Sequence, residues 1–284
     1  MKGAASSCAS VTVVNAMATG KGAAFGVELR LKAEVELDPT TKRIRGKVVG
    51  HDESPRLVEI CVRKVLEKYH RRCGAIVKTY SEIPVAVGLS SSSAAANAAV
   101  LATFASLGIE PDQREVLNLG IEASFEAGVT LTGAFDDAAA SLLGRGVITD
   151  NLKRRILKKF TLEPDYKVII FVPPKKLYTS RVNPSLFKDI KDLIDVAHRQ
   201  AISGNIFGAM VLNGLAYSHV LKQDPNIALE AISEGALAAG LTGKGPAVAA
   251  IAYPEDVKRI KRIWSKRKGK IIVTSPSREG ARIE

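Results

Sequence analysis

The most informative stretch of this 284-residue chain is Pro84-Val85-Ala86-Val87-Gly88-Leu89-Ser90-Ser91-Ser92-Ser93-Ala94-Ala95-Ala96. Gly88 can adopt a positive φ and lets a ligand approach the backbone closely. The serines stand where an alanine-rich helix begins, so free N–H groups, hydroxyls and the helix dipole converge there. The stretch therefore predicts a cradle for a polyphosphate. The alternative is a serine-rich turn that only caps a core helix.

Two other phosphate-binding motifs are missing from the sequence. A Walker A loop ending at Gly243-Lys244 would need glycine at position 238 and Ser or Thr at position 245, where Ala238 and Gly245 stand. No G-x-G-x-x-G motif follows a predicted strand either. The prediction of a phosphate site therefore depends on the serine stretch alone.

The pattern around the serine stretch predicts a domain of mixed strands and helices. Residues 25–37 alternate between apolar and charged side chains, which is typical of a half-buried strand. Further strands are predicted at 4–14, 43–49 and 75–82. Helices are predicted at 56–72, 111–127 and 136–143, and one more follows the serine stretch and ends at residue 107.

A charged connector is predicted between residues 150 and 166, and a second set of strands and helices follows it. Strands are predicted at 167–172, 247–253 and 270–274, and helices at 184–203, 205–222, 226–239 and 254–267. Mixed elements in both halves indicate an α+β fold with two domains, 1–160 and 161–284.

The charge balance favours anionic partners. Lys and Arg number 41 against 29 Asp and Glu, a formal charge of +12, which suits phosphates, carboxylates or nucleic acid. The three cysteines and four histidines show neither a disulfide framework nor metal-ligand spacing. No apolar run reaches 18 residues, and the N-terminus lacks the apolar core of a signal peptide, so we expect a cytoplasmic protein without a membrane partner.

A basic run between Lys258 and Lys270 holds eight Lys or Arg in 13 positions. Taken alone, such a run could bind nucleic acid. Val257, Ile260 and Trp264 repeat at helical spacing, however, and only one aromatic residue accompanies them. The run therefore predicts an amphipathic surface helix, and no nucleic-acid partner is expected.

Three segments together resemble the motifs of the GHMP kinases, which include galactokinase, homoserine kinase, mevalonate kinase and phosphomevalonate kinase. Residues 84–94 are similar to the second motif, P-x-x-x-G-L-G-S-S-A. Ser90 replaces the glycine that follows the leucine of this motif, and Ser93 replaces its alanine. Residues 240–247, Gly-Leu-Thr-Gly-Lys-Gly-Pro-Ala, are similar to the third motif. Residues 15–29 stand where the first motif belongs.

Within this family the chain is most similar to the archaeal shikimate kinases, through residues 14–26, 88–94 and 131–138. The resemblance implies the two-domain GHMP kinase fold, with an N-terminal α+β domain, a ferredoxin-like C-terminal domain and the active site between them. It implies ATP and Mg²⁺ at the serine loop, with binding residues Pro84, Val85, Ala86, Val87, Gly88, Leu89, Ser90, Ser91, Ser92, Ser93 and Ala94. It implies that shikimate is phosphorylated on its 3-hydroxyl, with homoserine or mevalonate as the alternative acceptors.

The resemblance also assigns catalytic and metal-binding roles. Asp136 falls in the position of the catalytic base or orienter, and an unpaired carboxylate among such apolar neighbours would be costly to bury. The alternative for Asp136 and Asp137 is capping of the helix that follows, which we favour for Asp137. Ser92 and Glu126 are expected to hold the metal ion, with Glu122 a poorer candidate.

The remaining predicted residues would contact the acceptor. Lys21, flanked by glycines, would pair with the shikimate carboxylate or lie beside Asp136 and lower its pKa, unless it is a plain surface lysine. Asn15 is a further polar contact. Thr242, Gly243 and Gly245 would line the site from the C-terminal domain.

Overall fold

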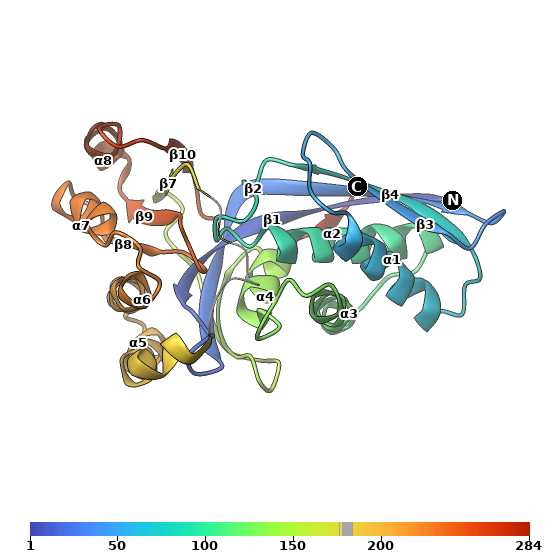
Figure 1. Ribbon diagram of the computed structural model, residues 1–284, viewed down its shortest axis with the longest axis horizontal. Coiled ribbons are helices and arrows are strands. Elements are labelled where there is room, and N and C mark those ends of the chain that lie inside the picture. Colours follow the sequence, from blue (N-terminus) through green and yellow to red (C-terminus); the bar gives the residue numbers. More distant parts are fainter. Residues whose placement is uncertain (176, 178–183) are drawn as a thin grey trace.

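The computed structural model describes residues 1–175, 177 and 184–284, and these form two lobes, each built on one sheet (Figure 1). The first sheet has seven strands among the described residues, in the order β11-β1-β2-β4-β3, with β5 beside β2 and β6 beside β5. Its strands are β1 (Lys2–Val14), β2 (Lys21–Asp38), β3 (Ile44–Val48), β4 (Gly74–Ser81), β5 (Gly146–Asp150), β6 (Arg155–Phe160) and β11 (Arg282–Ile283).

The long strand β2 organises this sheet. The alternating pattern of its sequence buries one face, as expected for a strand with one face on the core. Its second half pairs with β4, from Leu31 opposite Ser81 to Asp38 opposite Gly74. Its first four residues pair with β5, from Lys21 opposite Asp150 to Ala24 opposite Val147. One strand therefore joins the part of the sheet under the helices to the part that reaches the second lobe.

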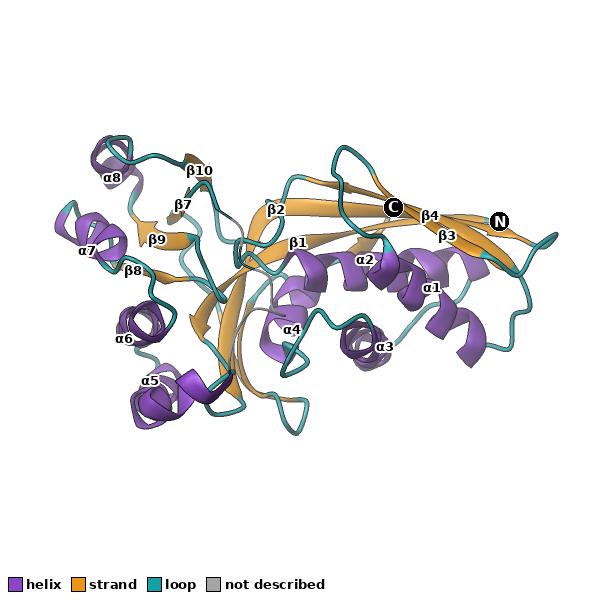
Figure 2. Ribbon diagram, viewed as in Figure 1, coloured by secondary structure: helices purple, strands orange, loops and turns teal. Residues whose placement is uncertain are grey.

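Four helices cover one face of the first sheet: α1 (Arg56–Lys68), α2 (Ser91–Leu107), α3 (Gln113–Glu126) and α4 (Phe135–Leu143) (Figure 2). The alanines of α2 let it pack directly on β1. A Cβ atom at Gly3 would lie 2.3 Å from the Ala102 carbonyl oxygen, so the two backbones are in near contact. This packing fixes α2 with its serine-bearing first turn directed at the second lobe.

The second lobe has a four-stranded antiparallel sheet, in the order β10-β7-β9-β8, among the described residues. This order and the alternation with helices confirm the ferredoxin-like prediction. The strands are β7 (Lys167–Val172), β8 (Ala238–Leu241), β9 (Val248–Ala252) and β10 (Lys270–Thr274). The helices are η2 (Pro184–Ile190), α5 (Lys191–Ser203), α6 (Ile206–Val220), α7 (Asn226–Ser233), η3 (Pro254–Asp256) and α8 (Val257–Trp264). No helix in the described part of the chain could cross a membrane.

Two predictions about elements are wrong. The charged connector at 150–166 is mostly the hairpin of β5 and β6, in which only Ile156 and Phe160 of β6 turn inward, so the exposed lysines mask the alternation. The helix predicted over 226–239 ends at Ser233. Gly235 there adopts φ +101°, which breaks the helix, and the residues from Ala238 form β8.

The end of the chain returns to the first sheet, which the sequence pattern did not predict. Pro276 bridges to Val27, and β11 pairs antiparallel with β1, with Ile283 opposite Ala5. The Glu284 amide then donates to the Ala4 carbonyl at 2.9 Å. The chain thus crosses from the first sheet to the second and back.

Candidate active site

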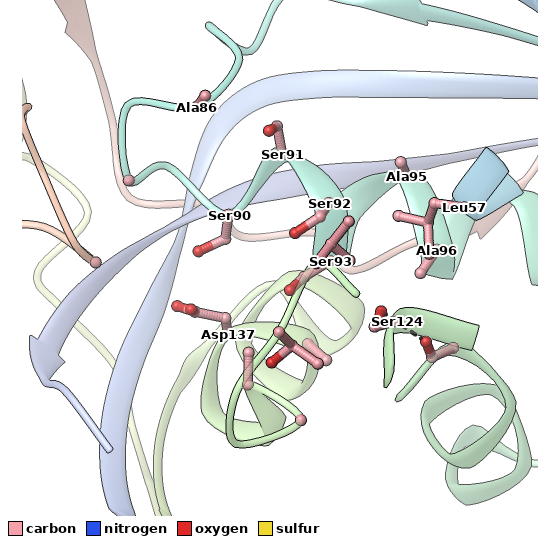
Figure 3. A pocket seen from close by; sticks show the side chains of 18 of the residues that line it. Leu57, Ala86, Ser90, Ser91, Ser92, Ser93, Ala95, Ala96, Ser124 and Asp137 are labelled. Carbon is pink, nitrogen blue, oxygen red and sulfur yellow. Dashed lines mark hydrogen bonds between the residues drawn. The ribbon is translucent and has the colours of Figure 1, made fainter. Parts of the chain in front are cut away.

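A pocket of about 420 Å³ lies where the first turn of α2 faces α4 and the turn between β8 and β9. Its wall includes the end of β1, the serine loop, the 128–134 loop and Gly243-Lys244. Residues far apart in sequence, from both lobes, therefore line one cavity. Figure 3 shows the serine side chains of α2 at this pocket, with Asp137 across from them.

The serine loop contributes its backbone and its hydroxyls to the pocket. The pocket is lined by Val85, Ala86, Gly88, Ser90, Ser91, Ser92 and Ser93. Val87, Leu89 and Ala94 instead turn into the core. A Cβ at Gly88 would lie 2.1 Å from the Thr242 carbonyl oxygen, so only glycine lets the second lobe approach this closely. The predicted loop thus has a wall of polar groups and an anchor of apolar ones.

Ser90 stands where the second GHMP motif usually has glycine, and its backbone explains the difference. Ser90 precedes α2 with φ 56° and ψ 33°, in the left-handed region that favours glycine. Its hydroxyl hydrogen-bonds the Asp137 carboxylate, toward which it points in Figure 3. This contact offsets part of the backbone strain, which is of order 1–2 kcal/mol for a non-glycine residue. Ala86 and Ala134 also line the pocket at positive φ.

Asp136 is buried in the pocket wall and faces polar and glycine neighbours. Its side chain accepts a hydrogen bond from Asn151 Nδ2 at 2.7 Å, and Asn151 in turn accepts one from the Thr149 hydroxyl at 2.7 Å. A Cβ at Gly22 would lie 2.3 Å from Asp136 Oδ2. Burial and the neighbouring Asp137 raise the pKa of Asp136 to about 7, although the Asn151 bond opposes this. A carboxyl group poised near neutrality can take up a proton from a substrate.

Asp137 does not cap the helix, so that interpretation is wrong. Helix α4 begins at Phe135 and its N-cap residue is Ala134, with no side-chain cap hydrogen bond. The Asp137 carboxylate accepts a hydrogen bond from the Ser10 hydroxyl at 2.9 Å and another from Ser90. Burial raises its pKa, and Ser90, Ser10 and Lys244 counteract the rise. It links β1, the serine loop and the second lobe.

The turn after β8 is bonded tightly to the first lobe. The Thr242 hydroxyl donates to the Gly88 carbonyl at 2.9 Å and accepts from the Thr12 amide at 3.1 Å. The Gly243 amide donates to the Thr12 hydroxyl at 2.9 Å, and Asn15 Nδ2 donates to the Gly243 carbonyl at 2.8 Å. Asn15 and Gly243 line the pocket, whereas Thr242 is fully buried behind it. Gly245 closes this turn, its amide 2.8 Å from the Thr242 carbonyl.

Lys21 and Glu126 lie apart from the pocket wall. Lys21 begins β2, and its Nζ is 2.9 Å from Asp195 Oδ1 of α5, with 47% of its side chain exposed. Glu126 ends α3, where it pairs with Arg63 and, at 3.4 Å, with Lys64, and these partners lower its pKa. Glu122 lies 3.9 Å from Lys64 on the same surface. The described residues hold no cluster of three or more His, Cys, Asp or Glu that could bind a metal.

Four pocket residues escaped prediction, Thr12, Asn97, Ser124 and Lys244, and so did Ser10 and Asn151, which bond the carboxylates of Asp137 and Asp136. Ser124 of α3 lines the pocket close to the serine turn (Figure 3), and its hydroxyl donates to the Gly120 carbonyl at 2.8 Å. Asn151 follows β5 directly, in the turn of residues 151–154, and its burial becomes visible only in the structure. Lys244 belongs to the third motif, but no role in the site was predicted for it, because it was considered only as part of a Walker A loop.

The chain matches two family models. Residues 56–145 match "GHMP kinases N terminal domain" and residues 221–271 match "GHMP kinases C terminal". These matches contain the serine loop and α4 in the first case and the Gly243-Lys244 turn in the second. The serine loop, the 128–134 loop and Gly243-Lys244 thus fall within the matched segments, whereas the end of β1 lies outside them.

Curated relatives cover nearly the whole chain. A shikimate kinase from Methanothrix thermoacetophila is 43% identical over 283 residues, covering 100% of this chain and 96% of its own. A shikimate kinase from Methanothermobacter thermautotrophicus is 42% identical over 280 residues, covering 96% and 95%. Among solved structures, homoserine kinase from Cytophaga hutchinsonii shares the fold with a TM-score of 0.77 at 18% identity, covering 100% and 97%. Mevalonate kinase from Methanococcus jannaschii gives 0.71 at 15% identity, covering 96% and 98%.

Proposed function

We propose, from the premise that this chain belongs to the GHMP kinase family, that it is an ATP-dependent shikimate kinase. The two relatives above, at 42% and 43% identity over almost the full length, carry the choice of acceptor. The single structural observation that supports the chemistry is the pocket, which is lined both by the serines at the start of α2 and by the buried Asp136 carboxyl, whose pKa is raised to about 7 by burial and by Asp137. Under this proposal the enzyme works in the cytoplasm, in aromatic amino acid biosynthesis.

The reaction divides between the two sides of the pocket. The triphosphate of ATP lies at residues 84–94, where backbone N–H groups and serine hydroxyls can receive it. The 3-hydroxyl oxygen of shikimate attacks the γ-phosphorus, and the bond from that phosphorus to the β–γ bridging oxygen breaks, so ADP leaves with the electron pair. The hydroxyl proton passes to the Asp136 carboxylate. Phosphoryl transfer of this kind depends mainly on positioning and charge stabilisation.

The chain's own residues keep this base in place. Asn151 holds one oxygen of Asp136, and Gly22 leaves room for the other. Asn15 and Gly243 line the acceptor side, with Thr242 buried behind them and Gly245 closing the same turn. In this proposal the polar contacts to shikimate come from both lobes.

The donors in the pocket fit Mg²⁺ only in company with ATP. The ion prefers oxygen ligands and is commonly held by few protein groups together with substrate phosphates. Ser92 presents a hydroxyl in the pocket, in keeping with its proposed role. When bound, Mg²⁺ would neutralise charge on the transferred phosphoryl group.

Glu126 and Lys21 keep their proposed roles on one condition each. Glu126 must leave Arg63 and Lys64 to reach the metal, and Lys21 must leave Asp195 to reach the acceptor carboxylate. Exposed ion pairs of this sort are worth about 0–1 kcal/mol, so ligand binding could exchange them. Lys21 as a surface lysine is the competing interpretation.

The proposal is tested by measuring ADP release from ATP with shikimate, homoserine and mevalonate in turn. We expect kcat/KM for shikimate to exceed that for the other two by roughly 100-fold or more, because unpaired polar groups in the site penalise the wrong acceptor. NMR of the product should place the phosphate on the 3-hydroxyl. Equal or faster turnover of homoserine or mevalonate would give the enzyme that acceptor instead.

A basic nucleic-acid-binding protein is the second candidate, supported by the formal charge of +12. The basic helix α8 turns Ile260 and Trp264 into the core, and Arg259 and Arg262 pair with Asp256 and Glu234. Much of its charge therefore has partners within the protein. A salt-dependent gel shift of RNA, together with no ATP turnover on any of the three acceptors, would favour this candidate.

A further inference from the structure

The charges that line the pocket are poorly matched to its proposed ligands. The charged side chains among the described lining residues are Glu53, Asp136, Asp137 and Lys244, so Lys244 is the one cation there. ATP and shikimate are both anions. Two anions brought together in a partly buried cavity repel each other unless a cation lies close to them. Lys244 is therefore the residue on which the electrostatics of the pocket turn.

The backbone around Lys244 is held in place by both lobes. The amide of Gly243, just before it, donates to the Thr12 hydroxyl at 2.9 Å, and the amide of Gly245, just after it, donates to the Thr242 carbonyl at 2.8 Å. The Ala247 amide bonds the Val87 carbonyl of the serine loop at 3.0 Å. The backbone of Lys244 is therefore held in a fixed position next to the serine loop.

The ammonium group of Lys244 has donors to spare. Within the described residues no carboxylate lies within the 4.0 Å of an ion pair, and its electrostatic partner is Asp137. Burial lowers the pKa of Lys244, and Asp137 counteracts this. An ammonium carries three N–H donors. A half-buried cation in this condition gains much from an anionic ligand.

Asp137 indicates which anion Lys244 meets. The same carboxylate accepts a hydrogen bond from Ser90, the residue immediately before the first turn of α2. Lys244 therefore stands on the side of Asp137 where the phosphate chain of ATP would end.

We propose that Lys244 binds the γ-phosphoryl group of ATP from the second lobe, opposite the serine hydroxyls, and that it stabilises this group during transfer. This inference rests on the proposed kinase function and adds to it a phosphate-binding residue in the third motif. In this proposal the β8–β9 turn of the second lobe positions the Lys244 ammonium group beside a phosphate that is bound by the serine loop of the first lobe.

The test compares nucleotides that differ in the γ-phosphoryl group. The affinities of the full-length protein and of Lys244→Met for ADP and for the non-hydrolysable ATP analogue AMP-PNP are measured by calorimetry with Mg²⁺. Met keeps the length of the side chain and removes its charge. We expect the affinity for AMP-PNP to fall at least ~10-fold and that for ADP to stay within ~3-fold, since a charge-assisted bond to phosphate is lost. Lys244→Arg should recover part of the loss.

Controls separate this inference from the proposed function. Lys266→Met, which removes an exposed lysine of the second lobe, should leave both affinities unchanged. Since Lys244→Met leaves Asp137 without its cation, the double variant Lys244→Met/Asp137→Asn is measured as well and should show the same selective loss. These binding measurements need no acceptor, so a wild type that binds AMP-PNP but fails to phosphorylate shikimate would overturn the proposed acceptor alone.

Three results would overturn the inference. Equal losses for ADP and AMP-PNP would assign Lys244 to another part of the nucleotide. A fall in shikimate affinity with both nucleotides unaffected would assign it to the acceptor carboxylate. Unchanged binding of all three ligands would make it a structural lysine.

Discussion

Asp136 combines two conditions that oppose each other in most proteins, since it is a carboxyl only 4% exposed and yet it must ionise to act. Burial and the adjacent Asp137 raise its pKa to about 7, against an ordinary value of 3.8. Its reactive form as a base is the carboxylate. We therefore expect kcat/KM for shikimate to rise with pH, with the midpoint of the rise near pH 7, and to level off about one pH unit higher.

This pH dependence is measured at saturating ATP and low shikimate. The control is Asp136→Asn, whose residual activity should lack the inflection, while any titration of the nucleotide itself affects both proteins equally. A wild-type profile that is flat between about pH 6 and pH 8 would remove Asp136 as the base.

Asp136→Asn should lose most of kcat and yet gain stability at high pH. Loss of a positioned base costs roughly 10²- to 10⁴-fold in rate. The folded pKa lies above the unfolded one, so the native state binds more protons between the two values, and its stability falls as pH rises from 3.8 through about 7. Asn cannot ionise, so it avoids this loss. The melting temperature of the variant, minus that of the wild type, should be larger at about pH 8.5 than at about pH 5.5.

The residue scale also shows where sequence reasoning reached its limit. Asp136 could be predicted because a carboxyl within an apolar run needs a reason to be there. Its partners could not. Asn151 lies in the turn between β5 and β6, within the segment predicted as a connector, and Lys244 meets Asp137 only because the second lobe packs against the first. Contacts of this kind depend on tertiary packing, which local patterns do not contain.

At the scale of elements, β2 and α4 are in close contact where Gly22 meets the side chain of Asp136. Gly22 of β2 leaves its missing Cβ position to Asp136 Oδ2. Gly22→Ala should lower kcat by about 100-fold, since small misplacements of reacting groups are expensive. It should also lower the melting temperature, because a Cβ there would lie 2.3 Å from Oδ2, 2.6 Å from Cγ and 2.9 Å from Cβ of the buried Asp136. Steady-state kinetics and a melting curve measure the two effects.

A double variant checks that Gly22 acts through Asp136. In the Asp136→Asn background, Gly22→Ala should have little further effect on kcat, because interacting sites are not additive. A full additional loss in the double variant would mean that Gly22 serves the site in some other way, for example by direct contact with a ligand.

Elements with one clearly buried face were predictable, and those defined by their partners were not. Strand β2 alternates along its sequence and was predicted with its start a few residues late. Strand β6 has only Ile156 and Phe160 turned inward, and β11 has two exposed residues that pair with β1. Neither shows a periodicity that separates it from a loop. The serine loop was found because its composition is unusual and its glycine has a definite purpose.

At the scale of the whole molecule, one threonine joins the lobes at the pocket. The Thr242 hydroxyl satisfies both the Gly88 carbonyl and the Thr12 amide. Thr242→Val keeps the shape and leaves both groups unpaired, so we expect a loss of about 1–3 kcal/mol in stability for each unsatisfied group. KM for ATP should rise as well, because Gly88 belongs to the serine loop.

Thermal unfolding and steady-state kinetics test this variant against Thr161→Val, which changes an exposed threonine outside the pocket. Thr161→Val should have less than about 0.5 kcal/mol of effect. If both valine variants melt together with the wild type, the hydroxyl of Thr242 does not hold the lobes.

The pairing of β11 with β1 brings Glu284 close to the first residues of β1. Glu284 lies beside Ala4, three residues from Met1, a separation of about 10 Å along a strand. A linker of a few glycines and serines could therefore close the backbone into a ring. The ring could then be opened in the exposed turn at Pro39-Thr40, giving a circular permutant that starts at Thr40. We expect this permutant to fold and to keep kcat within about threefold of the parent, since the pocket depends on which strands are neighbours and not on the order in which they are synthesised.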